Sequence, residues 1–354
     1  MEDHELLTII KQAIEEGASD LHLSVNSPPT LRKNGELISL DMPLLRPKDT
    51  EMVAQEIVPS RQVEKLNTYG ECDFSYSLHG LGRFRVSVFH QRGSVSIVMR
   101  IIDKNIPNLS DLGLPSVVES FTDKEKGLVL VSGPASSGKS TTLAALLEKI
   151  NMERQEHIIT LENPIEFLHT HKKCIVNQRE IGQDSATFPQ ALKSSLRQDP
   201  DVIFLGEMRD LETIETAFAA AEMGCLVFGV FNAPDVFNTI ERIIESFPYY
   251  QQQQVRFNLA SALEGIIVQR LLPSNNVMGR IIAAEVLVGT TEVKTLIKEG
   301  RLEELYEEME NGGDYGMQTM DAHLKHLVEK DLVSPETAMI NALKSDYFKK
   351  FIKG

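Results

Sequence analysis

One short segment of the sequence has the residue types and spacing needed to hold a polyphosphate. Residues 133–140 fit the pattern G-x-x-x-x-G-K-[ST]. Gly133 and Gly138 permit the tight turns that aim backbone N–H groups at phosphate oxygens, and a helix that begins directly afterwards adds a favourable dipole. Lys139 would neutralise β- and γ-phosphate charge, while the Ser140 hydroxyl would hold Mg²⁺. We therefore predict an ATP-binding loop made of Gly133, Pro134, Ala135, Ser136, Ser137, Gly138, Lys139, Ser140 and Thr141.

A second residue that could take part in chemistry is an acid that follows a short apolar run. Residues 202–205 are all apolar, and Gly206 and Glu207 come next. In P-loop enzymes such a strand lies next to the P-loop strand and brings a carboxylate beside Mg²⁺ and the attacking water. There Glu207 would serve as general base by polarising that water. A surface glutamate after a buried strand fits the same residues, so the assignment depends on the P-loop earlier in the chain.

The elements that must position these groups alternate between strand and helix. The hydrophobic pattern predicts, in order, strand 127–132, helix 141–151, strand 157–161, helix 186–198, strand 202–205, helix 210–223 and strand 226–231. Strands that are separated by helices form a parallel sheet covered on both faces. The predicted fold class of this part is therefore α/β.

The first hundred residues follow a different pattern, typical of a small α+β domain. Helical spacing over 6–17 is followed by strand-like segments at 21–25, 73–78, 82–90 and 94–102. Asn34-Gly35 predicts a hairpin between Leu31 and Leu37. Two prolines and a glycine within 103–115 are typical of a linker, and from Thr290 on only helices are expected. We predict an N-terminal domain at 1–102, a linker at 103–116, a nucleotide-binding domain at 117–289 and a helical C-terminal region at 290–354.

Composition excludes several other classes of protein. With 42% hydrophobic and 25% charged residues the chain is typical of a globular protein, and it has no apolar stretch long enough to span a bilayer. Its first five residues are acidic where a signal peptide would be basic, so a cytoplasmic location is expected. The net charge of −15 argues against a nucleic-acid partner. Cys72, Cys174 and Cys225 have no paired spacing, so neither a cysteine zinc site nor a disulfide is expected.

Several further segments, in their order along the chain, point to one family. They are Ala18-Ser19-Asp20-Leu21-His22-Leu23, Gly82-Arg83-Phe84-Arg85-Val86, the P-loop with Thr141-Thr142-Leu143, Leu161-Glu162-Asn163-Pro164-Ile165-Glu166, Arg197-Gln198-Asp199-Pro200-Asp201, Gly206-Glu207-Met208-Arg209-Asp210 and Gly316-Met317-Gln318-Thr319-Met320-Asp321. Together these resemble the PilT-type ATPases that retract type IV pili, within the wider secretion and pilus-assembly ATPase superfamily. The resemblance runs nearly from end to end.

The resemblance implies a PAS-like N-terminal domain, a RecA-like ATPase domain and a homohexameric ring. It also implies ATP hydrolysis coupled to pilus retraction and twitching motility, through an inner-membrane platform protein of the PilC type, which places the motor peripherally at that membrane. Carried over by position, Glu162 and Glu207 would join Ser140 at Mg²⁺, with Glu207 as the Walker B glutamate. Arg85 and Arg100 match arginines that reach the nucleotide, although surface ion pairs explain them equally well.

The sequence also departs from the family pattern. Asn163 replaces an aspartate of the acidic box, and Cys225 and Asn232 stand where the family has two histidines. Glu292-Val293-Lys294 replaces the family's Ala-Ile-Arg motif. An asparagine amide donates hydrogen bonds but carries no charge and does not exchange a proton near neutral pH. Two interpretations remain: a working motor, or an accessory ATP-binding subunit with weak hydrolysis that co-assembles with a second retraction ATPase.

Overall fold

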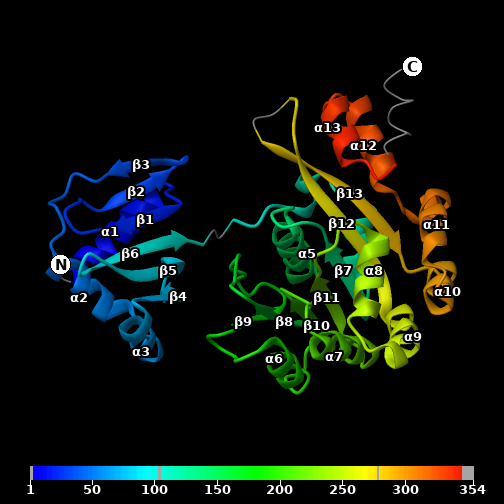
Figure 1. Cartoon of the computed structure of the whole chain (residues 1–354), viewed down its shortest axis with the longest axis horizontal. Helices are drawn as coiled ribbons and strands as arrows, with labels where there is room; N and C mark the ends of the chain where they lie inside the picture. Colours follow the sequence, from blue (N-terminus) through cyan, green and yellow to red (C-terminus); the bar gives the residue numbers. More distant parts are fainter. Residues whose placement is uncertain (1–2, 103–104, 277–278, 345–354) are drawn as a thin grey trace. The chain divides into compact units, whose positions relative to one another are not determined.

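The computed structural model describes residues 3–102, 105–276 and 279–344, and it divides the chain into two compact units (Figure 1). The first unit comprises the residues up to 104 together with 166–168. The second comprises 105–165 and the residues from 169 on. Within the described ranges, no helix is long and apolar enough to cross a bilayer.

In the described part of the first unit, six strands form an antiparallel sheet in the order β3-β2-β1-β6-β5-β4. The strands are β1 (Asp20–Leu23), β2 (Thr30–Lys33), β3 (Glu36–Ser39), β4 (Glu71–Leu78), β5 (Gly82–Gln91) and β6 (Ser94–Ile101). The helices are α1 (Asp3–Glu15), α2 (Pro47–Ile57) and α3 (Ser60–Tyr69). Side chains of α1 and α2 share one hydrophobic core with the sheet. The sequence analysis assigned neither α2 nor α3.

The hairpin predicted at Asn34-Gly35 is confirmed. Lys33 pairs with Glu36, so the turn consists of Asn34 and Gly35 alone, with φ of 51° and 88°. Both residues adopt the left-handed region that a two-residue hairpin turn requires, and asparagine and glycine tolerate it best.

In the described part of the second unit, seven strands form one sheet in the order β13-β12-β7-β11-β10-β8-β9. They are β7 (Gly127–Ser132), β8 (His157–Glu162), β9 (Ile175–Glu180), β10 (Val202–Leu205), β11 (Leu226–Val230), β12 (Leu263–Pro273) and β13 (Arg280–Val288). Every pair is parallel except β12 with β13. The predicted parallel-rich α/β sheet is thus confirmed, although the sequence analysis missed β9, β12 and β13.

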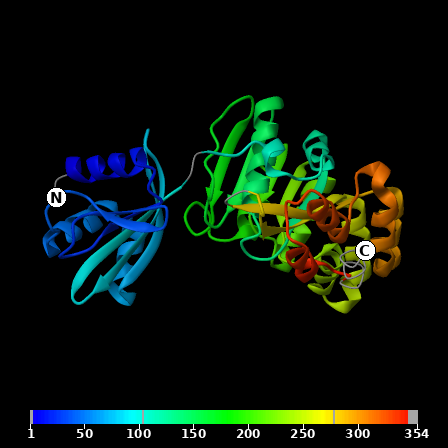
Figure 2. The same ribbon diagram turned by 90° about the horizontal axis from the view of Figure 1, so that it is seen from above.

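Helices cover both faces of this sheet (Figure 1; Figure 2). Along β7 the side chains alternate between two cores, because Val129 and Val131 pack with α5 whereas Leu128 and Leu130 pack with the helices of the opposite face. The helices are α4 (Val117–Ser120), α5 (Lys139–Glu153), α6 (Phe188–Ser195), α7 (Leu211–Glu222), α8 (Val236–Glu245), α9 (Gln252–Ala262), α10 (Thr291–Glu299), α11 (Leu305–Asn311), α12 (Met320–Glu329) and α13 (Pro335–Asn341).

The strand order corrects one expectation. The strand that precedes Glu207, β10, does not lie next to the P-loop strand β7, because β11 lies between them and pairs with both. The strand that follows β10 in the chain is inserted at the centre of the sheet. No local sequence pattern specifies that insertion, since it depends on how helices pack over the sheet.

Candidate functional site

The predicted phosphate loop joins the buried strand β7 to helix α5. Its backbone takes positive φ at Gly133 (140°), Ser136 (60°) and Gly138 (89°). A Cβ atom on Gly133 would lie 2.3 Å from the carbonyl oxygen of Gln269 on β12. Glycine is therefore required at 133 by the close approach of another strand as well as by its own dihedral angle.

Lys139 begins α5, and its ammonium group folds back over the loop. Its Nζ donates to the carbonyl oxygens of Gly133 at 3.0 Å and Pro134 at 2.7 Å. Gly138 is the N-cap residue and offers no side-chain cap, and Ser140 and Thr141 follow in the first turn, both half-buried. The N–H groups of that turn are thus left for an anion, which the helix dipole favours.

Gln269 braces the loop and was missed by the sequence analysis. Its side chain is fully buried, and its Nε2 donates to the backbone oxygen of Ser137 at 2.8 Å. Ser137 Oγ and Gln269 Oε1 are buried and have no hydrogen-bond partner among the residues that the structure describes. A glutamine that directly follows the apolar run 266–268 is the signal that could have identified it.

The two predicted acids lie at the ends of adjacent strands. Leu161 pairs with Leu205, and the N–H of Gly206 donates to the carbonyl oxygen of Leu161 at 2.8 Å. A Cβ on Gly206 would lie 3.2 Å from the Cα of Glu162. Glu162 and Glu207 therefore leave the same edge of the sheet from neighbouring strands, although β10 and β7 are not neighbours.

The environments of the two acids differ. Glu162 is buried, and its Oε1 accepts hydrogen bonds from Thr160 Oγ1 at 2.6 Å and Gln178 Nε2 at 3.1 Å. Glu207 is half-buried and lines a cavity. The described residues contain no group of three or more His, Cys, Asp or Glu side chains arranged to hold a metal ion.

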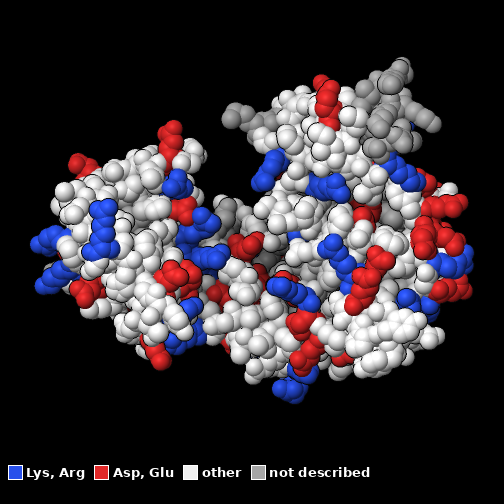
Figure 3. Space-filling model, viewed as in Figure 1, with Lys and Arg blue, Asp and Glu red and all other residues white. Residues whose placement is uncertain are grey.

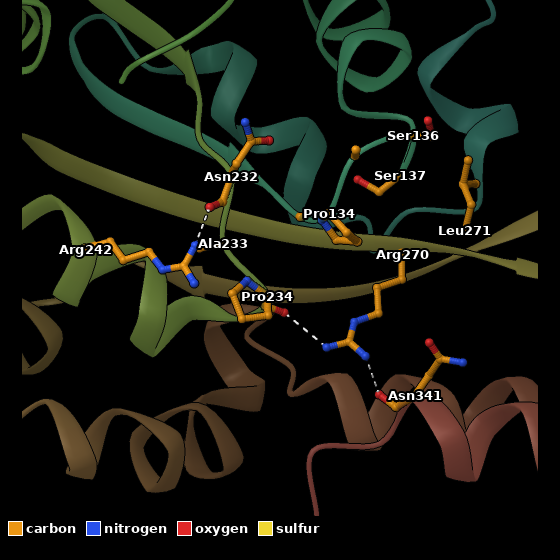
Figure 4. A pocket seen from close by; sticks show the side chains of 12 residues that line it. Pro134, Ser136, Ser137, Asn232, Ala233, Pro234, Arg242, Arg270, Leu271 and Asn341 are labelled. Carbon is orange, nitrogen blue, oxygen red and sulfur yellow. Dashed lines mark hydrogen bonds between the residues drawn. The ribbon is translucent and has the colours of Figure 1, made fainter. Parts of the chain in front are cut away.

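Two cavities share lining residues at this end of the sheet, and one of them is lined by the phosphate loop. One, of about 530 Å³, is lined by Gly133–Ser137 together with Arg270 (Figure 4). The other, of about 480 Å³, is lined by Glu207. Both are also lined by Asn232 and Arg242. Their volumes are in the range of small-molecule sites.

Asn232 and Cys225 lie beyond opposite ends of β11, the central strand of the sheet. Asn232 follows the carboxyl end of β11 and is exposed at the first cavity. Cys225 precedes the amino end of the same strand, is buried, and its Sγ donates to the Pro200 carbonyl oxygen at 3.3 Å. Burial raises the pKa of this thiol, which stays protonated. The length of β11 thus separates Cys225 from the phosphate loop, and of these two positions Asn232 is the one that borders the candidate site.

Arg85 and Arg100 lie in the first unit, directly opposite each other on β5 and β6. Both are exposed. Arg100 Nε forms an ion pair with Asp20 Oδ1 at 2.9 Å. Burial raises the pKa of Asp20, but hydrogen bonds from Ser19 and Arg100 outweigh it, so the net shift is downward. For Arg100 the structure therefore contains the surface ion pair that the sequence analysis had left open.

Glu285, on β13, is a second buried polar residue that the sequence analysis missed. One of its oxygens accepts the N–H of Val236 at 2.7 Å, and the other accepts that of Met320 at 3.3 Å. It thereby joins the start of α8, just after Asn232, to the start of α12. Burial raises the pKa of Glu285 to about 7, although the two N–H donors lower it.

Comparisons with known proteins cover nearly the whole chain. The family model described as "Type II/IV secretion system protein" matches residues 4–285. The chain is 41% identical over 334 residues to the "Type IV pilus retractation ATPase PilT" of Pseudomonas aeruginosa, covering 94% of this chain and 97% of that protein. It is 37% identical over 345 residues to the "Type IV pilus ATPase PilU" of the same organism, covering 98% and 90%. A crystal structure of the pilus retraction motor PilT with bound ADP superposes with a TM-score of 0.88 at 46% identity, covering 97% of this chain and 98% of that one.

The buried carboxyl of Glu285 predicts a pH dependence of stability. Its pKa is about 7 in the folded chain and roughly 4.3 in an unfolded one. Between these values the unfolded state has released a proton that the folded state keeps, so stability relative to Glu285→Gln falls as pH rises through this window. The expected fall is roughly 4 kcal/mol in total, with no further change above the folded pKa.

Urea denaturation of both proteins, followed by circular dichroism at pH 5 and pH 8, measures this difference. All other titrating groups are shared and cancel. A difference that stays constant between the two pH values would show that Glu285 is charged in the folded chain.

Proposed function

The chain belongs to the type II/IV secretion system protein family and is an ATPase, and from that premise we propose that it is the ATP-hydrolysing motor that retracts a type IV pilus. The observation that carries the proposal is its 41% identity to a type IV pilus retraction ATPase along 97% of that protein's length. A match of this extent includes the P-loop and both acidic positions. Twitching motility is the expected output of such a motor.

In this proposal the loop residues Gly133–Thr141 bind the nucleotide phosphates. Lys139 exchanges the neutral carbonyl oxygens of Gly133 and Pro134 for phosphate oxygens, which a cation prefers. The N–H groups at the start of α5 bind the same anion. Mg²⁺, when bound, neutralises phosphate charge, and Ser140, Glu162 and Glu207 are the residues that would hold it.

Glu207 is the proposed general base. It lies half-buried at a cavity that shares Asn232 and Arg242 with the phosphate-loop cavity, so its carboxylate can accept the proton of an attacking water. Glu162 is held by Thr160 and Gln178, which fixes its carboxylate before nucleotide arrives. The two acids thus have separate tasks. Glu162 would hold Mg²⁺ with a carboxylate whose orientation is fixed in advance, and Glu207 would accept the proton of the attacking water.

The proposed assembly is a homohexamer of chains with the organisation of the family. Residues 1–102 are the proposed PAS-like domain, 103–116 the linker, 117–289 the RecA-like ATPase domain and 290–354 the helical C-terminal region. Arg85 and Arg100 would serve the nucleotide across a subunit boundary, and Arg85 is the stronger candidate because Arg100 is paired with Asp20. The ring would act peripherally at the inner membrane on a platform protein of the PilC type.

An accessory subunit that merely binds ATP is not favoured. The chain keeps Lys139, Ser140, Glu162 and Glu207. Cys225, one of the departures that supported this alternative, lies at the opposite edge of the sheet. A nucleic-acid motor is not favoured either, because on the face shown in Figure 3 lysines and arginines are scattered among acidic side chains.

Replacing Lys139 with alanine tests the P-loop. Loss of its charge from the phosphates is expected to lower steady-state phosphate release by at least about a hundredfold, with circular dichroism unchanged. Lys126→Ala is the matched control, since this exposed lysine precedes the opposite end of β7. Wild-type turnover in the Lys139 variant would remove the P-loop from the mechanism.

Substitutions at positions 232 and 225, where the family has histidines, test whether Asn232 lies at the nucleotide site and Cys225 lies away from it. Asn232→His adds an imidazole beside the first cavity and is expected to raise maximal ATPase rate by up to about tenfold, because hydrogen bonds to charged groups contribute roughly 1.5–3 kcal/mol. Cys225→Ala is expected to stay within about twofold of wild type. A flat or falling rate for Asn232→His would contradict a role for this position in phosphate stabilisation.

Mixing two inactive variants tests whether Arg85 of one subunit serves the nucleotide bound by a neighbouring subunit. Arg85→Gln and Lys139→Ala are each expected to have low ATPase activity, and mixed rings are expected to recover part of it because some interfaces then contain one intact arginine and one intact loop. Light scattering with and without nucleotide measures ring size. A purely monomeric chain at high concentration, or no recovery on mixing, would count against the shared site.

A further inference from the structure

Arg242 lies where the phosphate-loop cavity and the Glu207 cavity meet. It projects from α8 (Figure 4). Both cavities are lined by Arg242 and by Asn232. Its side chain is exposed rather than packed into the core. A cation at this junction borders the loop that takes the phosphates on one side and the candidate general base on the other.

The charge of Arg242 is not balanced by a carboxylate in the described part of the chain. Its Nη1 donates to the neutral carbonyl oxygen of Asn232 at 2.9 Å. Glu245, one turn further along α8, lines the same cavity, yet none of the described ion pairs includes Arg242. A guanidinium that is hydrogen-bonded only to a neutral acceptor gains substantially when an anionic oxygen replaces that acceptor.

Arg270 is an alternative cation and fits less well. It lines the phosphate-loop cavity but not the cavity of Glu207. Its guanidinium is held on two sides, donating to the Asn341 carbonyl oxygen at 2.9 Å and to that of Pro234 at 3.3 Å. These contacts tie together two backbone segments, which suits a structural role.

We propose that Arg242 is a catalytic residue that binds the terminal phosphate of ATP within its own subunit and stabilises the charge that develops there during hydrolysis. The proposal rests on the proposed ATPase function and adds a residue to it. Arg242 would supply the positive charge that Asn232, at the same junction, lacks. It would leave the Asn232 carbonyl when the terminal phosphate arrives and return after phosphate release.

The test compares Arg242→Gln and Arg242→Lys with wild type in the full chain. Arg280→Gln is the control, because this exposed arginine lies on β13 and lines neither of the two cavities described above. The measurements are kcat and KM for phosphate release, and Kd for ADP and for ADP with aluminium fluoride. Thermal unfolding checks that each variant is folded.

Arg242→Gln is expected to lower kcat by about ten- to a hundredfold and to weaken binding of ADP with aluminium fluoride by a similar factor. ADP affinity should change by less than about threefold, since ADP has no terminal phosphate. Arg242→Lys should retain part of the activity because it keeps the charge without the planar fork. Wild-type kcat in Arg242→Gln, or an equal loss of affinity for both ligands, would overturn the proposal.

The binding measurements separate this inference from the proposed function. A wild-type chain that binds both ligands but releases no phosphate would contradict the motor. The difference between the two ligands in Arg242→Gln would still decide whether Arg242 contacts the terminal phosphate position.

Discussion

Parallel pairing of strands in the second unit is the constraint on which the candidate site depends. Because β7, β8, β10 and β11 run in one direction, their carboxyl ends meet at a single edge. That edge gathers the phosphate loop, Glu162, Glu207 and Asn232, which are far apart in the sequence. The opposite edge holds Cys225, so the same hydrogen-bond ladders that assemble the site also keep this residue away from it. Ligands in open parallel sheets bind beyond the carboxyl ends of the strands for this reason.

Two buried polar side chains on β12 and β13 connect that edge to the rest of the second unit. Gln269 holds the loop at Ser137, and Glu285 holds the starts of α8 and α12. A buried polar group is costly unless it is hydrogen-bonded, so each side chain favours a single arrangement of its neighbours. The paired strands β12 and β13 thereby link the phosphate loop, the segment after β11 and the C-terminal helices through hydrogen bonds between buried side chains and backbone groups.

Much of this protein was determined by local sequence. The eight-residue P-loop predicts its own conformation, because glycines at fixed positions and a following helix are sufficient to shape a phosphate site. The alternation of apolar and amphipathic runs predicted the parallel sheet, and Asn34-Gly35 predicted a hairpin that the structure contains. The P-loop and the hairpin turn each lie within one short window, and so does the pattern of each single strand or helix. The apolar run 202–205 singled out Glu207, and family resemblance added Glu162, which belongs to a motif of a few consecutive residues.

Contacts between distant segments were decided by tertiary structure alone. The insertion of β11 between β7 and β10, the pairing of Arg100 with Asp20, and the approach of Gln269 to the loop all join segments far apart in the chain. Arg242 has no motif of its own, and it becomes a candidate only because α8 places it between two cavities. A sequence window records which side chains are available. Packing of helices on the sheet decides which of them meet, because burial and backbone pairing act across the whole fold at once.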